Sequence, residues 1–126
     1  MNRAGDWMRQ ADRDARHAAN ALEDGDFEWS CFAAQQAAEK AFKAALQQRN
    51  KEGWGHSVTG LCQALAEEME VPAELLEAGK RLDKHYIPSR YPNGFASGAP
   101  GDYYTRDDAD RAVQDANQII RFCKGL

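Results

Sequence analysis

The sequence is poor in the residues that build β-sheets. Only eight of its 126 residues are β-branched, whereas 22 are alanine, the strongest helix former. This composition excludes a β-sandwich or β-barrel and predicts an all-α fold. A chain of this length suits one domain spanning residues 1–126, with enough apolar surface for a single hydrophobic core.

Cysteine and long apolar runs are scarce as well. The three cysteines, Cys31, Cys62 and Cys123, lie far apart and form no Cys-x-x-Cys motif. This spacing predicts buried, reduced thiols rather than disulfides or a zinc site, and we expect neither a metal nor a cofactor. No run approaches the ~20 apolar residues of a membrane-spanning helix, so we expect no membrane partner. The N-terminus MNRAGDWMRQ is too polar for a secretory signal, which predicts a cytoplasmic location.

Positive charge is also in short supply. The chain has 16 Lys and Arg residues against 20 Asp and Glu residues, which gives a formal net charge of −4. A domain that binds nucleic acid through bulk electrostatics is normally basic, so any contact with RNA or DNA must come from a local cluster. Glycine-rich phosphate loops, serine nucleophile elbows and His-Glu-x-x-His motifs are absent, and the enzyme classes that depend on them gain no support.

The first half of the chain shows apolar residues at helical spacing. A first helix is predicted over about residues 4–23, and Gly25 provides a left-handed stop. A second is predicted over about residues 27–49, with Asp26 in position to cap it. The apolar side chains of the second helix nearly encircle its axis, which predicts a central helix with neighbours on several sides.

Three further helices are predicted in the second half. The third opens at His56 or Ser57, and the fourth starts at Pro72 and carries its apolar face to Tyr86. The last begins at a capping box over residues 105–108 and runs nearly to the C-terminus. Five helices with mostly short connections predict an up-and-down bundle.

Residues 87–104, IPSRYPNGFASGAPGDYY, interrupt the helical pattern and contain three of the four prolines. Loops of this length are uncommon in compact domains and are usually functional or disordered. All four tyrosines of the chain lie between Tyr86 and Tyr104. Because disordered segments are poor in aromatic residues, we predict that this loop is packed.

The segment Tyr86-Ile-Pro-Ser-Arg90-Tyr91-Pro is the strongest candidate site. Arg90 offers a planar fork of five donors that suits phosphate or carboxylate. Tyrosines beside it can stack on a nucleobase or anchor a partner protein. The structural alternative carries equal weight: the tyrosines cover the end of the bundle, and Arg90 pairs with an acidic helix terminus.

Charged and titratable residues elsewhere have weaker support. Lys43 follows Glu39 by four residues; it either adds positive charge near Arg90 or, as we prefer, forms an ordinary helical ion pair. His56 is expected to help begin the third helix rather than to act in catalysis. His85 borders the proline-rich loop, where it could contact a ligand.

Three segments, in this order and spacing, carry a family resemblance: CFAAQQAAEKAFKAAL at residues 31–46, Gly-His-Ser at residues 55–57 and LDKHYIPSRYPNG at residues 82–94. They resemble the HEPN family (higher eukaryotes and prokaryotes nucleotide-binding) over essentially the whole chain. The resemblance implies a five-helix bundle similar to the substrate-binding domain of aminoglycoside nucleotidyltransferases. It also implies a homodimer that works with a minimal nucleotidyltransferase in a two-component, toxin–antitoxin-like system.

The same resemblance implies an alternative, a metal-independent dimeric ribonuclease with an Arg-x(4–6)-His motif. There the Arg stabilises the phosphate, and the His moves the proton of the attacking 2′-hydroxyl. Arg49 and His56 meet the spacing, but they lie earlier in the chain than the family's motif. Arg81 and His85 enclose only three residues, and no histidine follows Arg90.

The leading hypothesis from the sequence is therefore a nucleotide-binding and partner-binding module rather than an enzyme. Arg90 would hold a phosphate, Lys43 would support it, and an aromatic wall would be formed by Tyr86, Tyr91 and Tyr104. The ribonuclease, with RNA as its substrate, is the alternative. A third hypothesis is a purely structural subunit whose loop docks the nucleotidyltransferase.

Overall fold

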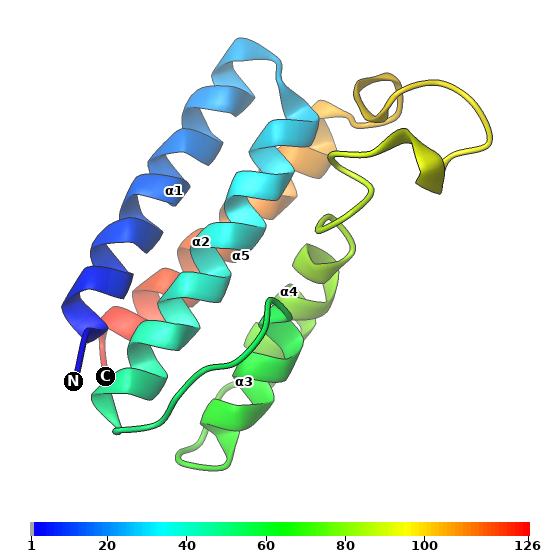
Figure 1. Cartoon of the computed structure of the whole chain (residues 1–126). Helices are drawn as coiled ribbons and strands as arrows, with labels where there is room; N and C mark the ends of the chain where they lie inside the picture. Colours follow the sequence, from blue (N-terminus) through cyan, green and yellow to red (C-terminus); the bar gives the residue numbers. More distant parts are fainter. Residues whose placement is uncertain (1) are drawn as a thin grey trace.

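The computed structural model describes residues 2–126 and contains five α-helices: α1 (Ala4–Asp24), α2 (Phe27–Gln48), α3 (Val58–Ala66), α4 (Ala73–Asp83) and α5 (Arg106–Lys124). Residues 2–126 contain no β-strand, so the predicted all-α, five-helix fold is confirmed. The long helices α1, α2 and α5 lie side by side, and the shorter α3–α4 pair packs beside α2 and α5 (Figure 1). Within this part of the chain, no helix is long and apolar enough to cross a membrane.

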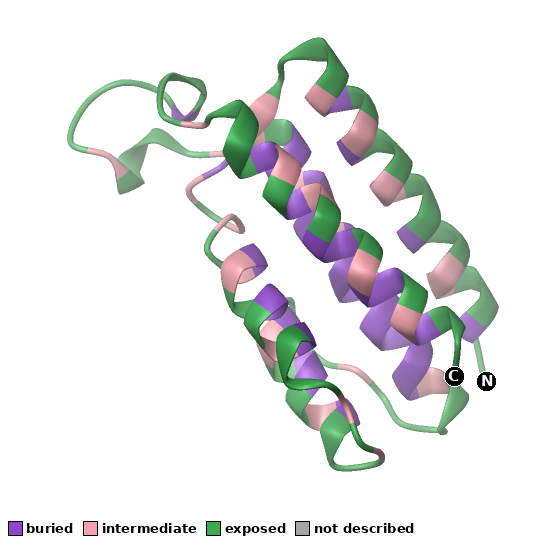
Figure 2. Ribbon diagram, turned by 180° about the vertical axis from the view of Figure 1, so that it is seen from behind, coloured by how far each residue is buried: buried purple, intermediate pink, exposed green. Residues whose placement is uncertain are grey.

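Helix α2 forms the centre of the bundle, as its apolar pattern predicts. Fourteen of its 22 residues are buried, and it packs against each of the other four helices. Figure 2 shows the buried residues along α2 and on the inner faces of its neighbours. The small alanine side chains let those neighbours approach closely, while Phe42 and Leu46 fill the larger spaces.

The three cysteines lie in this core as free thiols, as predicted. Burial raises the pKa of Cys31 to about 12, and it has the same effect on Cys123. Thiols with so high a pKa stay protonated and unreactive, which is the behaviour of structural cysteines.

Local sequence signals account for several helix ends. Gly25 ends α1 in the left-handed conformation, with φ of 82°. At the start of α5, the N–H of Asp108 donates to Thr105 Oγ1, and the N–H of Thr105 donates to the Asp108 carboxylate, which confirms the predicted capping box. Asp26 occupies the predicted N-cap position of α2, although its side chain forms no capping hydrogen bond.

The connection between α2 and α3 runs back along α2 instead of turning sharply. Gly53 packs so closely that a Cβ atom there would lie 3.0 Å from Lys43 and 3.1 Å from Leu46. His56 follows Gly53 by three residues, and its carbonyl accepts a hydrogen bond from Gln35 Nε2 at 2.7 Å. Helix α3 therefore starts beside the middle of α2 and runs in the same direction (Figure 1).

The end of α4 holds the start of α3. The Asp83 carboxylate accepts from the N–H of Val58 at 2.7 Å, the N–H of Thr59 at 2.9 Å and the Ser57 hydroxyl at 2.9 Å. Ser57, not His56, is the N-cap, because its hydroxyl accepts from the N–H of Gly60. The prediction that His56 helps to begin this helix is therefore wrong. Asp83 supplies negative charge where the unpaired N–H groups of α3 are exposed.

Helix α4 ends at Asp83, so the expected extension to Tyr86 is wrong and the following residues form turns. The loop of residues 87–104 contains two short 3₁₀ turns, Pro92–Gly94 and Pro100–Asp102, and it projects from one end of the bundle (Figure 1). Ser89 and Pro100 are buried, but most residues between them are exposed. The prediction of a packed loop thus holds at its two ends and fails in the middle.

His85 and Tyr104 join the two ends of this loop. His85 Nδ1 lies 3.1 Å from the Tyr104 hydroxyl, and the two rings meet edge to face. Burial lowers the pKa of His85, outweighing the nearby carboxylates of Asp108 and Asp115. Burial also raises the pKa of the Tyr104 hydroxyl, which can therefore donate to the neutral imidazole.

We expect this contact to make stability depend on pH. The folded-state pKa of His85 lies below its unfolded value near 6.5, so the unfolded chain takes up the proton first as the pH falls. The contribution of neutral His85 is complete above about pH 6.5 and declines below it. Urea unfolding at pH 7.5 and 5.5 should show a larger loss of unfolding free energy for the wild type than for His85→Asn, which keeps a polar group near Nδ1. Equal losses in the two proteins would contradict this assignment.

Candidate functional site

Arg90 sits in the turn that follows α4, and its guanidinium folds back onto the main chain. Its Nε and Nη2 groups donate to the carbonyl of Tyr86 at 2.9 and 2.7 Å. The Arg90 side chain makes no other hydrogen bond or ion pair among residues 2–126, so three of the five N–H groups of its guanidinium have no protein partner. The predicted pairing of Arg90 with an acidic helix terminus does not occur in this part of the chain.

Three aromatic rings surround the Arg90 guanidinium. Its central carbon lies 4.3 Å from the ring centre of Phe32, 4.8 Å from that of Tyr86 and 5.1 Å from that of Tyr91. Tyr91 is 47% exposed, so the group opens to solvent on its side. Contacts at these distances hold the charge in place without neutralising it, which leaves Arg90 able to bind an anion.

A second group of polar residues touches the same cluster through Tyr86. The His56 ring stacks on Tyr86 with 5.1 Å between ring centres, and its Nδ1 lies 3.2 Å from a carboxylate oxygen of Glu39. Because a carboxylate only accepts, Nδ1 carries the proton and donates it, which leaves Nε2 as the free nitrogen. The His56 side chain is 60% exposed.

Glu39 is buried and has a second polar neighbour, Lys43. The Lys43 ammonium lies 3.3 Å from the other carboxylate oxygen of Glu39 and 5.2 Å from the ring centre of Trp7. The preferred structural interpretation of this pair is therefore confirmed. Removal of one partner would leave a buried charge without compensation, so the pair stabilises the position of both side chains.

The structure brings together only part of the predicted site. Tyr86 and Tyr91 lie against Arg90 as expected. Lys43 has no direct contact with Arg90 in the described residues and connects to it only through Glu39, His56 and Tyr86. Tyr104, the last residue of the loop, bonds to His85 and is not one of the three rings around Arg90.

The Arg and His residues of the spacing motif lie apart within one chain. Arg49 lies at the end of α2, where its Nη2 contacts the sulfur of Met69. His56 pairs with Glu39, which precedes Arg49 by ten residues and therefore lies about 15 Å away along the helix. The residues of the second near-match, Arg81 and His85, line one pocket, but each is bonded to another residue. Arg81 forms two 2.9 Å hydrogen bonds with Asp115, and His85 bonds to Tyr104.

Two important residues were not predicted, Phe32 under Arg90 and Glu39 as the partner of His56. Both are on α2, far in sequence from the residues that they contact. Large or ionic residues among the alanines of α2 are the only local signal that could have identified them.

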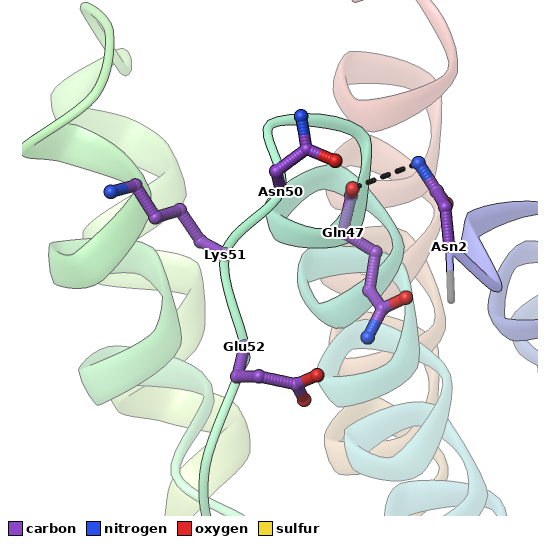
Figure 3. A pocket seen from close by; sticks show the side chains of 5 residues that line it. All are labelled: Asn2, Gln47, Asn50, Lys51 and Glu52. Atoms are coloured by element: carbon purple, nitrogen blue, oxygen red, sulfur yellow. Dashed lines mark hydrogen bonds between the residues drawn. The ribbon is translucent and has the colours of Figure 1, made fainter.

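A separate polar pocket of about 240 Å³ lies where α2 ends, lined by Asn2, Gln47, Asn50, Lys51 and Glu52 (Figure 3). The Asn2 side chain donates to the carbonyl of Gln47 at 3.1 Å, and this hydrogen bond fixes the N-terminal segment against α2. None of the predicted site residues lines it. Nowhere in residues 2–126 do three His, Cys, Asp or Glu side chains gather as metal ligands would.

Comparisons with known proteins agree with this fold. A protein from Thermus thermophilus is 46% identical, with 99% of this chain and 98% of that chain covered and a TM-score of 0.95. A crystallised archaeal HEPN homologue is 42% identical, with 99% and 98% covered and a TM-score of 0.84. A HEPN domain protein of Thermotoga maritima is 40% identical over 95% of both chains, with a TM-score of 0.79.

A more distant relative is a protein of Methanocaldococcus jannaschii whose name describes a candidate toxin. It is 25% identical over 127 residues, which cover 94% of this chain and 84% of the relative. The HEPN domain family matches residues 4–126. The chain therefore belongs to the HEPN domain family.

Proposed function

We propose that this protein binds a nucleotide through Arg90 and acts with a minimal nucleotidyltransferase in a two-component, toxin–antitoxin-like system. One observation carries the proposal: the Arg90 guanidinium is held by the Tyr86 carbonyl and keeps three free N–H donors among three aromatic rings. A fixed guanidinium suits phosphate, and the rings suit a base or a partner side chain.

The similarity to the candidate toxin supports the two-component part of the proposal, because it extends over nearly the whole of this chain. The protein also acts as a homodimer in this proposal. The exposed ring of Tyr91 supplies contact surface. Aromatic residues at such positions often dominate the binding energy of protein interfaces.

The nucleotide part is tested by replacing Arg90. Arg90→Ala should weaken ATP binding at least about tenfold in calorimetry, since hydrogen bonds to a charged group contribute about 1.5–3 kcal/mol. Arg90→Lys should bind with intermediate affinity because it keeps the charge and loses the fork. Arg121→Ala, at an exposed position on α5, is the control and should bind as the wild type does. Unchanged affinity in Arg90→Ala would refute the role of Arg90.

The partner part is tested by co-purification with a minimal nucleotidyltransferase encoded beside this protein. Tyr91→Ala should weaken that complex about 30-fold, as expected for an aromatic hot spot worth about 2 kcal/mol. Tyr103 has the same 47% exposure and lies in the same loop, so Tyr103→Ala is a matched control. Equal retention of the partner by both variants would show that Tyr91 is not a docking residue.

A second candidate function, a metal-independent ribonuclease, is favoured by the Glu39–His56 pair. A histidine that a buried carboxylate orients through one nitrogen, in a side chain that is 60% exposed, has the arrangement of a general base. Tyr86 contacts both His56 and Arg90, so a base and an anion-binding group flank one ring. In this candidate Arg90, rather than Arg49, serves the phosphate.

Labelled RNA incubated with the purified protein in EDTA tests this candidate. If the wild type cleaves, His56→Ala should lower the rate at least about 100-fold, the usual contribution of a general base. His85→Asn should retain the activity, because His85 Nδ1 is bonded to Tyr104 away from this pair. Absence of cleavage by the wild type, or equal loss in the two variants, would eliminate the assignment to His56.

A further inference from the structure

A cleft of about 240 Å³ opens between α1 and α2, next to the Arg90 cluster. Its walls combine two aromatic rings with polar side chains: Trp29, Phe32, Asp14, His17, Gln36 and Lys40. The rings of Trp29 and Phe32 meet edge to face, with 6.3 Å between their centres and an angle of 81°. Trp29 is 49% exposed, so its ring is accessible to a flat ligand.

Phe32 belongs to both the cleft and the Arg90 cluster. It lines the cleft together with Trp29, and its ring also lies 4.3 Å from the Arg90 guanidinium and 6.2 Å from the centre of the Tyr86 ring. The Phe32 ring therefore connects the cleft with the Arg90 guanidinium. A small ligand with a flat part and an anionic part can reach both.

The polar wall of the cleft is organised by one hydrogen bond between α1 and α2 and by two hydrogen bonds within these helices. Lys40 donates to the Asp14 carboxylate at 2.6 Å and to the Gln36 amide oxygen at 3.3 Å. Gln10 donates to the other Asp14 oxygen at 2.9 Å. A carboxylate, an amide and an ammonium group held in this way supply both acceptors and donors for the edge of a heterocycle.

The size of the cleft restricts its ligand. Sites for drug-sized molecules usually measure about 300–1,000 Å³, so this cleft suits a single ring system rather than a whole nucleotide. Two aromatic rings that are partly open to solvent are typical of platforms on which bases stack.

We propose that the cleft between α1 and α2 is a nucleobase subsite, in which the base stacks on Trp29 and meets the nearly perpendicular Phe32 ring with its edge, while Arg90 binds the phosphate of the same nucleotide. This inference rests on the proposed nucleotide binding by Arg90 and specifies where the base lies. Asp14, Gln36 and Lys40 face the edge of the base.

The test compares ribonucleoside triphosphates with inorganic tripolyphosphate, which has the phosphates but no base. ATP, GTP, CTP and UTP are titrated separately by calorimetry and by NMR of the tryptophan indole groups. At least one nucleotide should bind more tightly than tripolyphosphate and shift the Trp29 indole signal. Trp54, which is 82% exposed in the connection between α2 and α3 and does not line the cleft, is the internal control and should not respond as Trp29 does.

Variants then separate the base from the phosphate. Trp29→Leu should weaken nucleotide binding about tenfold, within the range for base–aromatic stacking, and should leave tripolyphosphate affinity unchanged. Trp54→Leu should change neither affinity. The NMR shift of wild-type Trp29 provides a result that does not depend on the folding of any variant.

Contradictory outcomes distinguish this inference from the function on which it rests. If nucleotides bind through Arg90 but leave the Trp29 signal and the Trp29→Leu affinity unchanged, the base subsite is wrong and the proposed function stands. If neither nucleotides nor tripolyphosphate bind, both fail. If the Trp29 signal changes with protein concentration but not with nucleotide, the cleft is an interface between copies of the chain, and the base subsite is wrong.

Discussion

Close packing around α2 is the constraint on which the rest of the structure depends. Alanine occupies half of its buried positions, so neighbouring backbones approach closely and little space remains for larger side chains. One row of larger aromatic and polar side chains follows α2 at steps of three or four residues: Trp29, Phe32, Gln36, Glu39 and Lys43. The cleft, the Arg90 cluster and the His56 pair all form around this row.

The electrostatics of the site follow from the burial of Glu39. A buried carboxylate is costly unless charges and hydrogen bonds compensate it, and Glu39 receives both from Lys43 and His56. The segment before α3 runs back along α2 and brings His56 to that carboxylate. His56 in turn supports Tyr86, whose ring and carbonyl hold Arg90. Stability and the candidate ligand site therefore share the same contacts.

The accuracy of the sequence predictions depended on how far apart the interacting residues lie in the chain. Gly25 and the Thr105–Asp108 capping box were predicted correctly because each acts within a few residues. Tyr86 and Tyr91 were placed correctly beside Arg90 for the same reason. His56 was misassigned as a capping residue, because its partner Glu39 lies 17 residues earlier and no local pattern joins the two.

The sequence by itself determined the helical class, the five helices and the concentration of tyrosines around Arg90, since composition, periodicity and turn chemistry are local properties. Only the tertiary structure decided which side chains meet. It placed Phe32 against Arg90, Glu39 against His56 and Tyr104 against His85. These contacts arise when α2 is enclosed on several sides, because packing selects neighbours by shape and charge rather than by their order in the chain.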